Sequence, residues 1–367
     1  MILQLRPKPW MVVLLISVAY VGLILARQGG DPLAFALVGT RYSEDDPAGT
    51  WGYDGQFAYF IARDPLEGCQ HCDVPAYRLQ RVLYPLLAWA LALGRPAVVP
   101  WTLIVVNLAA VAVGTYFTEE LLASQDVSRW YALVYGLYGG LIAGLRLDLT
   151  EPLAYGLLQG GIWAWTKRRQ GLAVPLFAFA ALSKETTLIA VAGFLIFLLL
   201  NGQWREMALL GIGVVGPFLI WQGVLWTWLG EPGVGSGGAM ATSFEWFPFA
   251  GLLRTAGVSR QAFWVLLMVQ GPLFILPTVW ALVESARSHL RRRFHPWTTL
   301  LLMEAVVLPF LPFSTWREPL AMARLSTGLV AATLLYGARH HRRRVLNVSF
   351  AWLATLALLV NESQLPI

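Results

Sequence analysis

The sequence is short of charge. Only 13% of its 367 residues are Asp, Glu, Lys or Arg, whereas 57% are hydrophobic. A soluble domain carries about 25% charged residues, so the shortage excludes an ordinary water-soluble globular protein. It indicates that lipid is the solvent for much of the chain. The 17 Trp residues agree with this, because indole rings favour the lipid headgroup level.

A basic soluble module is also missing, although the formal net charge is +6. The Lys and Arg residues stand in short clusters between apolar runs, for example at 167–169, 291–293 and 342–344. Such clusters are typical of cytoplasmic loops that fix a membrane topology. They argue against nucleic-acid binding, which needs a basic face on a folded module.

The first apolar run, 10–26, follows Arg6 and Lys8. It is longer than the core of a signal peptide and has no convincing small-residue cleavage site, which favours a retained first helix. Because a helix needs about 20 mostly apolar residues to cross a bilayer, the sequence predicts an all-α membrane protein. We expect a polytopic bundle of about eleven transmembrane helices, with interfacial or re-entrant helices in the first outer loop. The candidate spans are 10–26, 98–117, 130–145, 149–166, 171–183, 186–200, 207–229, 261–283, 296–313, 319–337 and 345–361.

The basic clusters predict the orientation of the bundle. We expect the amino terminus and the segments 167–170, 287–295 and 339–344 to be cytoplasmic. Residues 82–94 are apolar but too short for an ordinary span, which favours a re-entrant or interfacial helix. If they did span, 118–129 would change sides. The segments expected outside are 27–97, 146–151, 184–186, 230–259, 314–318 and the tail after 361.

The most informative outer segment is WGYDGQFAYFIARDP at 51–65. Asp54 stands where a side chain caps a helix, and Tyr53, Phe57 and Phe60 share a face at helical spacing. The pattern predicts a short interfacial helix with a carboxylate at its amino end. From the residues alone, Asp54 is either a helix cap or a functional acid.

This segment resembles the first-outer-loop motif of the GT-C superfamily of membrane glycosyltransferases. It is similar to the WDxxWYxxIA element of the GPI-anchor mannosyltransferases and their bacterial relatives. Three further stretches agree in order: RLQRVLYPLL at 78–87 resembles the family's basic-aromatic YPLL segment, LTEPL at 149–153 its S/T-E-x-L turn, and ALSKET at 181–186 its LTK/R-E/P-T turn. The resemblance covers residues 10–200. It implies a catalytic transmembrane core at 1–200, which includes the outer loop 27–97, followed by variable transmembrane helices at 201–367.

The resemblance implies a glycosyltransferase in a bacterial inner membrane, with its active site on the outer face. The donor would be a polyprenyl-phosphate sugar, and the acceptor a cell-envelope glycan, lipid or protein. In the superfamily an Asp of the first outer loop is the catalytic base, and here that residue is Asp54. A carboxylate within hydrogen-bond reach takes the proton of the acceptor hydroxyl, and direct displacement inverts the anomeric centre.

The lipid phosphate needs cations, and Arg and Lys give it charge-assisted hydrogen bonds. The candidates for phosphate binding are Arg78, Arg81, Lys184, Arg317 and Arg324. The candidates for supporting roles are Tyr53, Gln56, Tyr59, Glu151 and Glu185.

Several of these candidates have a plainer interpretation. Arg78 and Arg81 would also gain from contact with lipid headgroups. The neighbours Lys184 and Glu185 would pair with each other. Arg324 lies in an apolar helix, where a charge usually has a function, and would reach either the phosphate or Glu304. A further pair, Arg146 and Asp148, would lie beside the same pocket.

No metal site is predicted, and a divalent metal is left open as a cofactor. Cys69 and Cys72 form one CxxC with His71 between them, short of a four-ligand set. In an oxidising outer compartment a local disulfide or an inert pair is favoured over a metal, and the state of the two cysteines is left open. The acidic run Glu44, Asp45 and Asp46 reads as solvated loop and remains a reserve for metal or base.

Two rival functions remain open: a transporter or flippase of a lipid-linked sugar, and a non-catalytic cell-envelope assembly protein. Against a transporter stand the lack of an internal repeat and the polar motifs on one face rather than at the midplane. An assembly protein would keep its function after Asp54→Asn.

Overall fold

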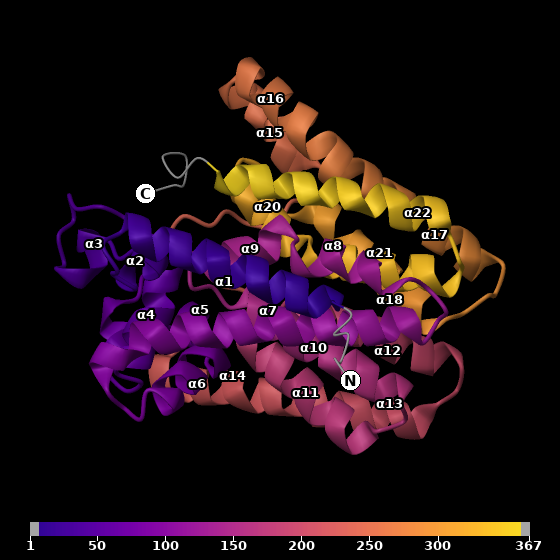
Figure 1. Cartoon of the computed structure of the whole chain (residues 1–367), viewed down its shortest axis with the longest axis horizontal. Coiled ribbons are helices and arrows are strands. Elements are labelled where there is room, and N and C mark those ends of the chain that lie inside the picture. Colours follow the sequence, from indigo (N-terminus) through magenta and orange to yellow (C-terminus); the bar gives the residue numbers. More distant parts are fainter. Residues whose placement is uncertain (1–6, 361–367) are drawn as a thin grey trace, which may run out of the picture.

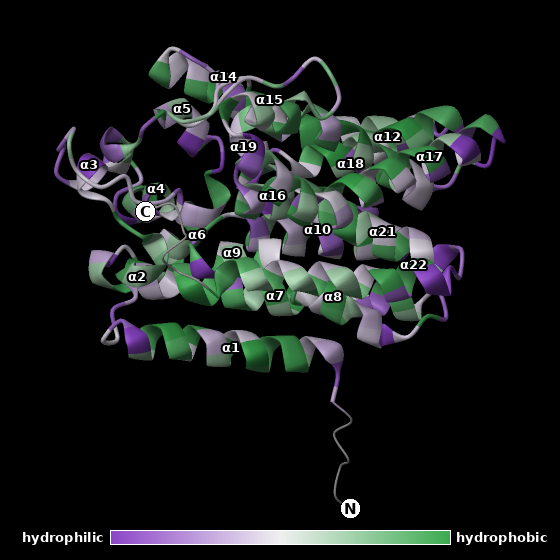
Figure 2. Cartoon of the chain, turned by 90° about the horizontal axis from the view of Figure 1, so that it is seen from above, coloured by the Kyte–Doolittle hydropathy of each residue, from purple (hydrophilic) through white to green (hydrophobic). Residues whose placement is uncertain are grey.

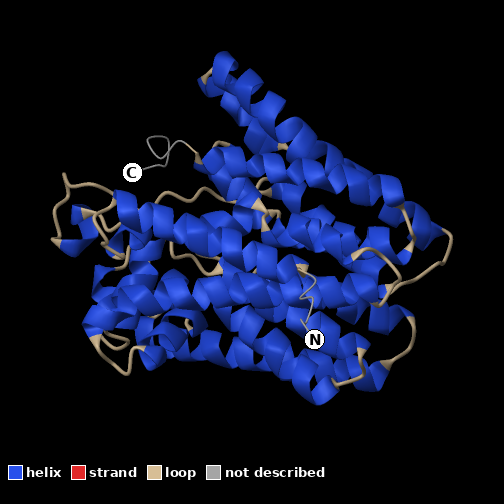
Figure 3. Ribbon diagram, viewed as in Figure 1, coloured by secondary structure: helices blue, strands red, loops and turns tan. Residues whose placement is uncertain are grey.

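The computed structural model describes residues 7–360, and the regular elements in that range are helices without any strand (Figure 3). Most of them run along one long axis (Figure 1). In chain order the elements are α1 (Pro9–Arg27), α2 (Leu33–Ala36), α3 (Thr40–Ser43), α4 (Gly55–Arg63), η1 (Gly68–His71), α5 (Pro75–Leu79), α6 (Leu83–Leu91), η2 (Pro96–Val98), α7 (Val99–Ala123), η3 (Arg129–Tyr131), α8 (Ala132–Gly136), α9 (Gly139–Arg146), α10 (Glu151–Thr166), α11 (Gln170–Ser183), α12 (Thr187–Leu200), α13 (Trp204–Leu210), η4 (Gly211–Val215), α14 (Gly216–Leu229), α15 (Ala250–Val258), α16 (Arg260–Gln270), η5 (Gly271–Ile275), α17 (Leu276–Leu290), α18 (Pro296–Val307), η6 (Leu308–Phe310), α19 (Phe313–Trp316), α20 (Pro319–Leu325), α21 (Thr327–Arg339), α22 (Arg343–Val348) and η7 (Ser349–Leu359).

Four helices in the described residues are long and apolar enough to cross a membrane: Pro9–Arg27, Pro96–Ala123, Trp204–Leu229 and Arg260–Leu290. The pair α20 and α21, bent by 48°, makes a fifth if it is counted as one span. Three further apolar helices, Gln170–Ser183, Thr187–Leu200 and Pro296–Phe310, are shorter. The fold is that of a helical membrane protein, and the number of eleven spans stays a prediction.

The surface of the long helices shows why lipid is needed. Only 28% of the most apolar stretch of α1 is buried within the protein, against 56% for Pro96–Ala123. Leu15, Ile16 and Leu23 of α1 are exposed, and hydrophobic residues cover this helix (Figure 2). Exposed apolar area on this scale is unfavourable in water, so the outer helices present it to the bilayer.

Several predicted spans are broken. The segment 130–145 is divided between α8 and α9, and 319–337 bends at Ser326. The expected re-entrant or interfacial segment 82–94 contains only α6, nine residues long. A helix of that length measures about 14 Å and cannot cross a core of about 30 Å, which agrees with the expectation.

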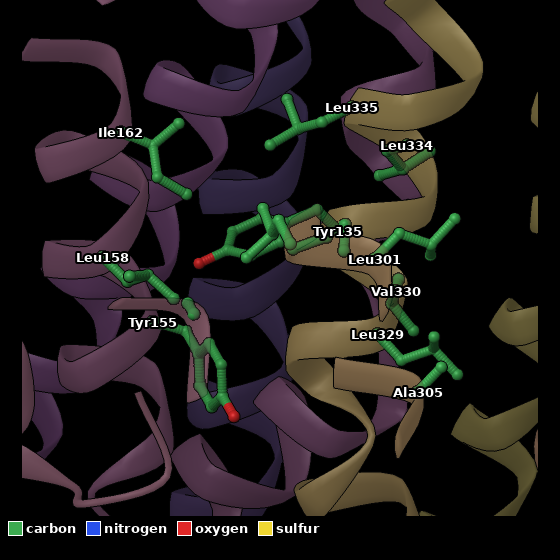
Figure 4. Close-up of a cluster of buried hydrophobic side chains, with 14 of the residues drawn as sticks. Tyr135, Tyr155, Leu158, Ile162, Leu301, Ala305, Leu329, Val330, Leu334 and Leu335 are labelled. Atoms are coloured by element: carbon green, nitrogen blue, oxygen red, sulfur yellow. The ribbon is translucent and has the colours of Figure 1, made fainter. Parts of the chain in front are cut away.

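The interior of the bundle is a large apolar cluster between α8, α10, α18 and α21. Tyr135 of α8 projects toward Tyr155 and Leu158 of α10, and leucines of α18 and α21 close the other side (Figure 4). Helix α10 packs between α7 and α11. This core fixes the amino end of α10, where Glu151 lies.

Polar residues gather at two opposite ends of the bundle (Figure 2). The elements α2 to α6 of the first loop lie at one end, on the left in Figure 1. The loop after α17 and the start of α22, which carry the basic clusters 291–293 and 342–344, lie at the other end. The two ends are therefore chemically distinct.

Candidate active site at the first-loop end of the bundle

Asp54 lies directly before α4 and makes no capping hydrogen bond with its side chain. Its carboxylate instead bridges two arginines, with Oδ1 3.0 Å from Arg78 Nη1 and Oδ2 3.3 Å from Arg324 Nη2. Burial acts to raise the pKa of Asp54, but the charges of Arg78 and Arg324 outweigh it and hold that pKa well below its usual value. The side chain is therefore an ionised acid in an ion-pair network, and not a helix cap.

Arg78 of α5 is held by two groups, one in the loop before α5 and one in α4. Its Nε and Nη2 donate to the two carboxylate oxygens of Asp73, at 2.7 and 2.8 Å. Its guanidinium also lies over the Phe57 ring, 4.1 Å from the centroid. A two-pronged carboxylate and an aromatic face fix the plane of the group, so Nη1 points at Asp54.

Arg324 comes from the other half of the chain, just before the bend between α20 and α21. Its Nε donates to Glu151 Oε1 at 2.7 Å, and its Nη1 donates to the Tyr53 hydroxyl at 2.9 Å. The Tyr53 hydroxyl in turn donates to Glu318 Oε1 at 2.7 Å. Lys184 donates to the same Glu151 oxygen at 2.9 Å. The pairs expected between Lys184 and Glu185, and between Arg324 and Glu304, are therefore not the ones that form.

Arg81 and Glu185 make a third pair. The Nε and Nη2 of Arg81 donate to the two Glu185 oxygens at 2.8 and 2.6 Å, and Nη2 also donates to the Tyr77 hydroxyl. This pair links the segment after α5 to the turn between α11 and α12. Residues of four distant parts of the sequence thus meet at one place.

These groups surround a small cleft, in which about 30 Å³ is accessible to solvent. Its lining residues are Asp54, Phe57, Ala58, Ile61, Arg78, Arg81, Pro85, Asp148, Leu149, Thr150, Glu151 and Arg324.

Three predicted residues lie outside this cluster. The Gln56 amide accepts from the Gly39 N–H and donates to the Trp51 carbonyl, so it fastens the first loop to α4. Tyr59 packs against neighbouring hydrophobic residues. Arg317 is exposed, with its guanidinium 5.9 Å from the Phe313 ring, and lines a separate groove beside α16.

The other acids and cysteines form no metal site: no group of three or more potential ligands is found in residues 7–360. Glu44, Asp45 and Asp46 are exposed loop residues. Cys69 and Cys72 are buried free thiols with their sulfurs 2.8 Å apart, so of the two favoured alternatives the structure has the unbridged pair.

Sequence reasoning missed Asp73, Tyr77 and Glu318, although each bonds a predicted residue. The sequence contains only weak signals for the acids among them. Asp73 precedes Val74-Pro75 at the start of a short helix, and Glu318 lies in a turn already singled out. Neither spacing shows which cation the acid faces.

Gly55, the residue after Asp54, is a sensitive packing point. A methyl group there would clash with the Leu147 carbonyl, and overpacking of this kind costs about 1–3 kcal/mol. We expect Gly55→Ala to lower thermal stability in detergent and to displace Asp54. Gly22→Ala in α1 is the matched control, because nothing lies within 4 Å of the added methyl, and it should leave stability equal or higher. Equal melting temperatures for Gly55→Ala and the unmodified chain would contradict the close contact.

Comparison of the chain with models of known protein families, with curated proteins and with solved structures finds no significant match.

Proposed function

We propose that the chain is an inverting glycosyltransferase that moves a sugar from a polyprenyl-phosphate donor to a cell-envelope glycan, lipid or protein. The observation that carries the proposal is the position of Asp54. It is 36% exposed at the cleft and is held between two arginines that are almost fully buried. A reachable carboxylate beside fixed cations is what an acceptor hydroxyl and a phosphate leaving group require.

The pairing of the charges supports a mechanism in which the donor phosphate replaces a carboxylate as the partner of an arginine or lysine. Arg78, Arg81, Lys184 and Arg324 are each paired with an acid, so an incoming phosphate must displace one. The two ion pairs of Asp54 have nitrogen–oxygen distances of 3.0 and 3.3 Å, the longest in the cluster. The other ion pairs have distances of 2.6–2.9 Å. A phosphate that takes donors of Arg78 and Arg324 would weaken their hold on Asp54 and raise its pKa. Donor binding would then make Asp54 a better base.

In the transfer step, the acceptor oxygen forms a bond to the anomeric carbon and gives its proton to Asp54. The bond between that carbon and the lipid-phosphate oxygen breaks, and its electron pair leaves with the phosphate. The arginines neutralise the charge that develops there. Attack opposite the leaving group inverts the anomeric centre.

We place the cleft on the outer face of a bacterial inner membrane, because the basic clusters lie at the other end of the bundle. Glu231 and Arg291 are exposed at these two ends. We expect an impermeant maleimide added to intact cells to label Glu231→Cys and to spare Arg291→Cys until the cells are opened. The unmodified chain is the control, since its two cysteines are buried. Labelling with the sides reversed would put the cleft in the cytoplasm and contradict the proposed site of action.

The activity itself is tested with the purified chain in liposomes. The donors are radiolabelled sugars on polyprenyl phosphate, and the acceptors are extracted envelope glycans, lipids and proteins. We expect the label to pass to one acceptor class with release of free polyprenyl phosphate. Movement of intact donor across the bilayer without its cleavage would favour a flippase instead.

A further inference from the structure

We propose that Asp148 and Glu151 form a sugar-binding subsite at the base of the cleft, where their free oxygens bind hydroxyl groups of the transferred sugar. This inference rests on the proposed function and names the part of the donor that each side of the cleft recognises. The cations of Arg78 and Arg324 would hold the phosphate, and the two acids would hold the sugar.

Three buried carboxylate oxygens beside the cleft lack a hydrogen-bond partner in the described part of the chain. Both carboxylate oxygens of Asp148 and the Oε2 atom of Glu151 make no hydrogen bond within residues 7–360. Both residues are fully buried, and both line the cleft. An unmet buried polar group is unfavourable, so three such atoms at one cleft indicate that something else supplies their partners.

The residues around Asp148 have other hydrogen-bond partners, although Tyr84 also lies close enough to affect the pKa of Asp148. The Tyr84 hydroxyl donates to the Leu103 carbonyl at 3.1 Å. Asn107 donates to the Tyr84 hydroxyl at 2.8 Å and to the Leu149 carbonyl at 3.0 Å. These bonds link α6, α7 and the turn before α10 beside Asp148, which itself lines the cleft.

The backbone of Asp148 is itself unusual, because its φ of 47° lies in the left-handed region. The bond from the Leu149 N–H to the Gly144 carbonyl, at 2.8 Å, closes the turn there. Asp adopts this conformation more readily than most non-glycine residues, and the turn places Asp148 between α9 and α10.

The chemistry of the group suits a hydroxyl. Burial raises the pKa of Asp148 well above its usual value, and the opposing effects of Arg146 and Tyr84 do not cancel this. A neutral carboxylic acid donates one hydrogen bond and accepts others. Sugar hydroxyls also do both, whereas a phosphate only accepts from cations and other donors. Asp148 is therefore a poor partner for phosphate and a good one for a sugar.

The different exposure of the acids indicates which end of the donor binds deeper in the cleft. The Asp54 side chain is 36% exposed, while Asp148 and Glu151 have no exposed area. A donor that binds with its phosphate on the arginines near Asp54 would place its sugar toward the deeper acids. The anomeric carbon between them would then lie beside the proposed base.

The test measures binding and not turnover, with the purified full chain in detergent. The probes are farnesyl phosphate alone and farnesyl phosphate linked to glucose, mannose, galactose, N-acetylglucosamine or arabinose. We expect the unmodified chain to bind at least one glycosylated probe about tenfold or more tightly than the bare phosphate. In Asp148→Gly that preference should vanish, while the affinity for the bare phosphate stays the same. Glycine accepts the positive φ without strain, so the variant should fold.

Two variants separate recognition from structure. Asp148→Asn keeps a donor, an acceptor and tolerance of the left-handed backbone, and should keep most of the preference. Arg78→Ala should weaken binding of the bare and the glycosylated probes alike. The melting temperature of Asp148→Gly without ligand should not fall, because an unpaired buried group is removed.

The outcomes are distinct. If the unmodified chain prefers a glycosylated probe and Asp148→Gly keeps that preference, the sugar subsite is wrong and the proposed transferase stands. If the bare phosphate binds as tightly as every glycosylated probe, the subsite is also wrong. If the unmodified chain binds none of the probes, the subsite and the proposed function both fail.

Discussion

Asp54→Asn should reduce sugar transfer by about 10²–10⁴-fold, the usual contribution of a positioned general base. The amide has nearly the shape of the carboxylate but cannot take the proton of the acceptor hydroxyl. The measurement is the rate of label transfer from the polyprenyl-phosphate donor, with the donor saturating.

The variant should still fold and insert, because each arginine keeps another acid. Arg78 retains its two bonds to Asp73, and Arg324 retains its bond to Glu151. A melting temperature close to that of the unmodified chain would show that the loss is chemical. The donor should still bind, since both arginines remain and one competitor for them has gone.

Asp45→Asn is the matched control for this experiment. Asp45 lies in the same first loop, is exposed, and has a φ of 54° that Asn adopts equally well. It belongs to the acidic run that was the reserve candidate for the base. We expect transfer to be unchanged in this variant. Full transfer in Asp54→Asn would remove the base from the mechanism and favour an assembly protein.

The local features of the site were predictable because they depend on nearby residues. A short helix after Asp54 follows from the spacing of Tyr53, Phe57 and Phe60, and the structure confirms it as α4. The gathering of the outer turns at one end follows from the basic clusters, since each apolar helix carries the chain to the opposite end. These inferences need no knowledge of tertiary packing.

The pairing of the charges was not predictable, because it depends on the direction of side chains at distant positions. Lys184 and Glu185 are neighbours, yet one bonds Glu151 and the other bonds Arg81. Adjacent residues at the end of a helix point to different neighbours, so sequence proximity predicted the wrong pair. The acid that faces Arg324 is 173 residues away.

The positions of Arg317 and Arg324 were also not predictable from the sequence. They lie close together in the sequence, and both were candidates for the lipid phosphate. Arg324 of α20 lines the cleft, whereas Arg317, at the end of α19, stays exposed near Phe313. Their spacing in the sequence does not show which of the two faces the cleft.

Arg324→Ala should be among the most destabilising single substitutions in the chain, at about 3–5 kcal/mol of unfolding free energy. The guanidinium is 9% exposed and donates to Glu151, Tyr53 and Asp54. Its removal leaves the fully buried Glu151 with Lys184 as its only cationic partner within residues 7–360. The free energy of unfolding in mixed micelles measures the effect.

Two further variants isolate the cause. Arg324→Lys keeps the charge but lacks the planar set of donors that reaches three partners at once, so its loss should be intermediate. Arg317→Ala removes an exposed arginine from the same region and should change stability by no more than about 0.5 kcal/mol. If Arg324→Ala were as stable as Arg317→Ala, the network would not hold the two halves of the chain together at the cleft. Asp54 would then need another cation than Arg324 to fix its position.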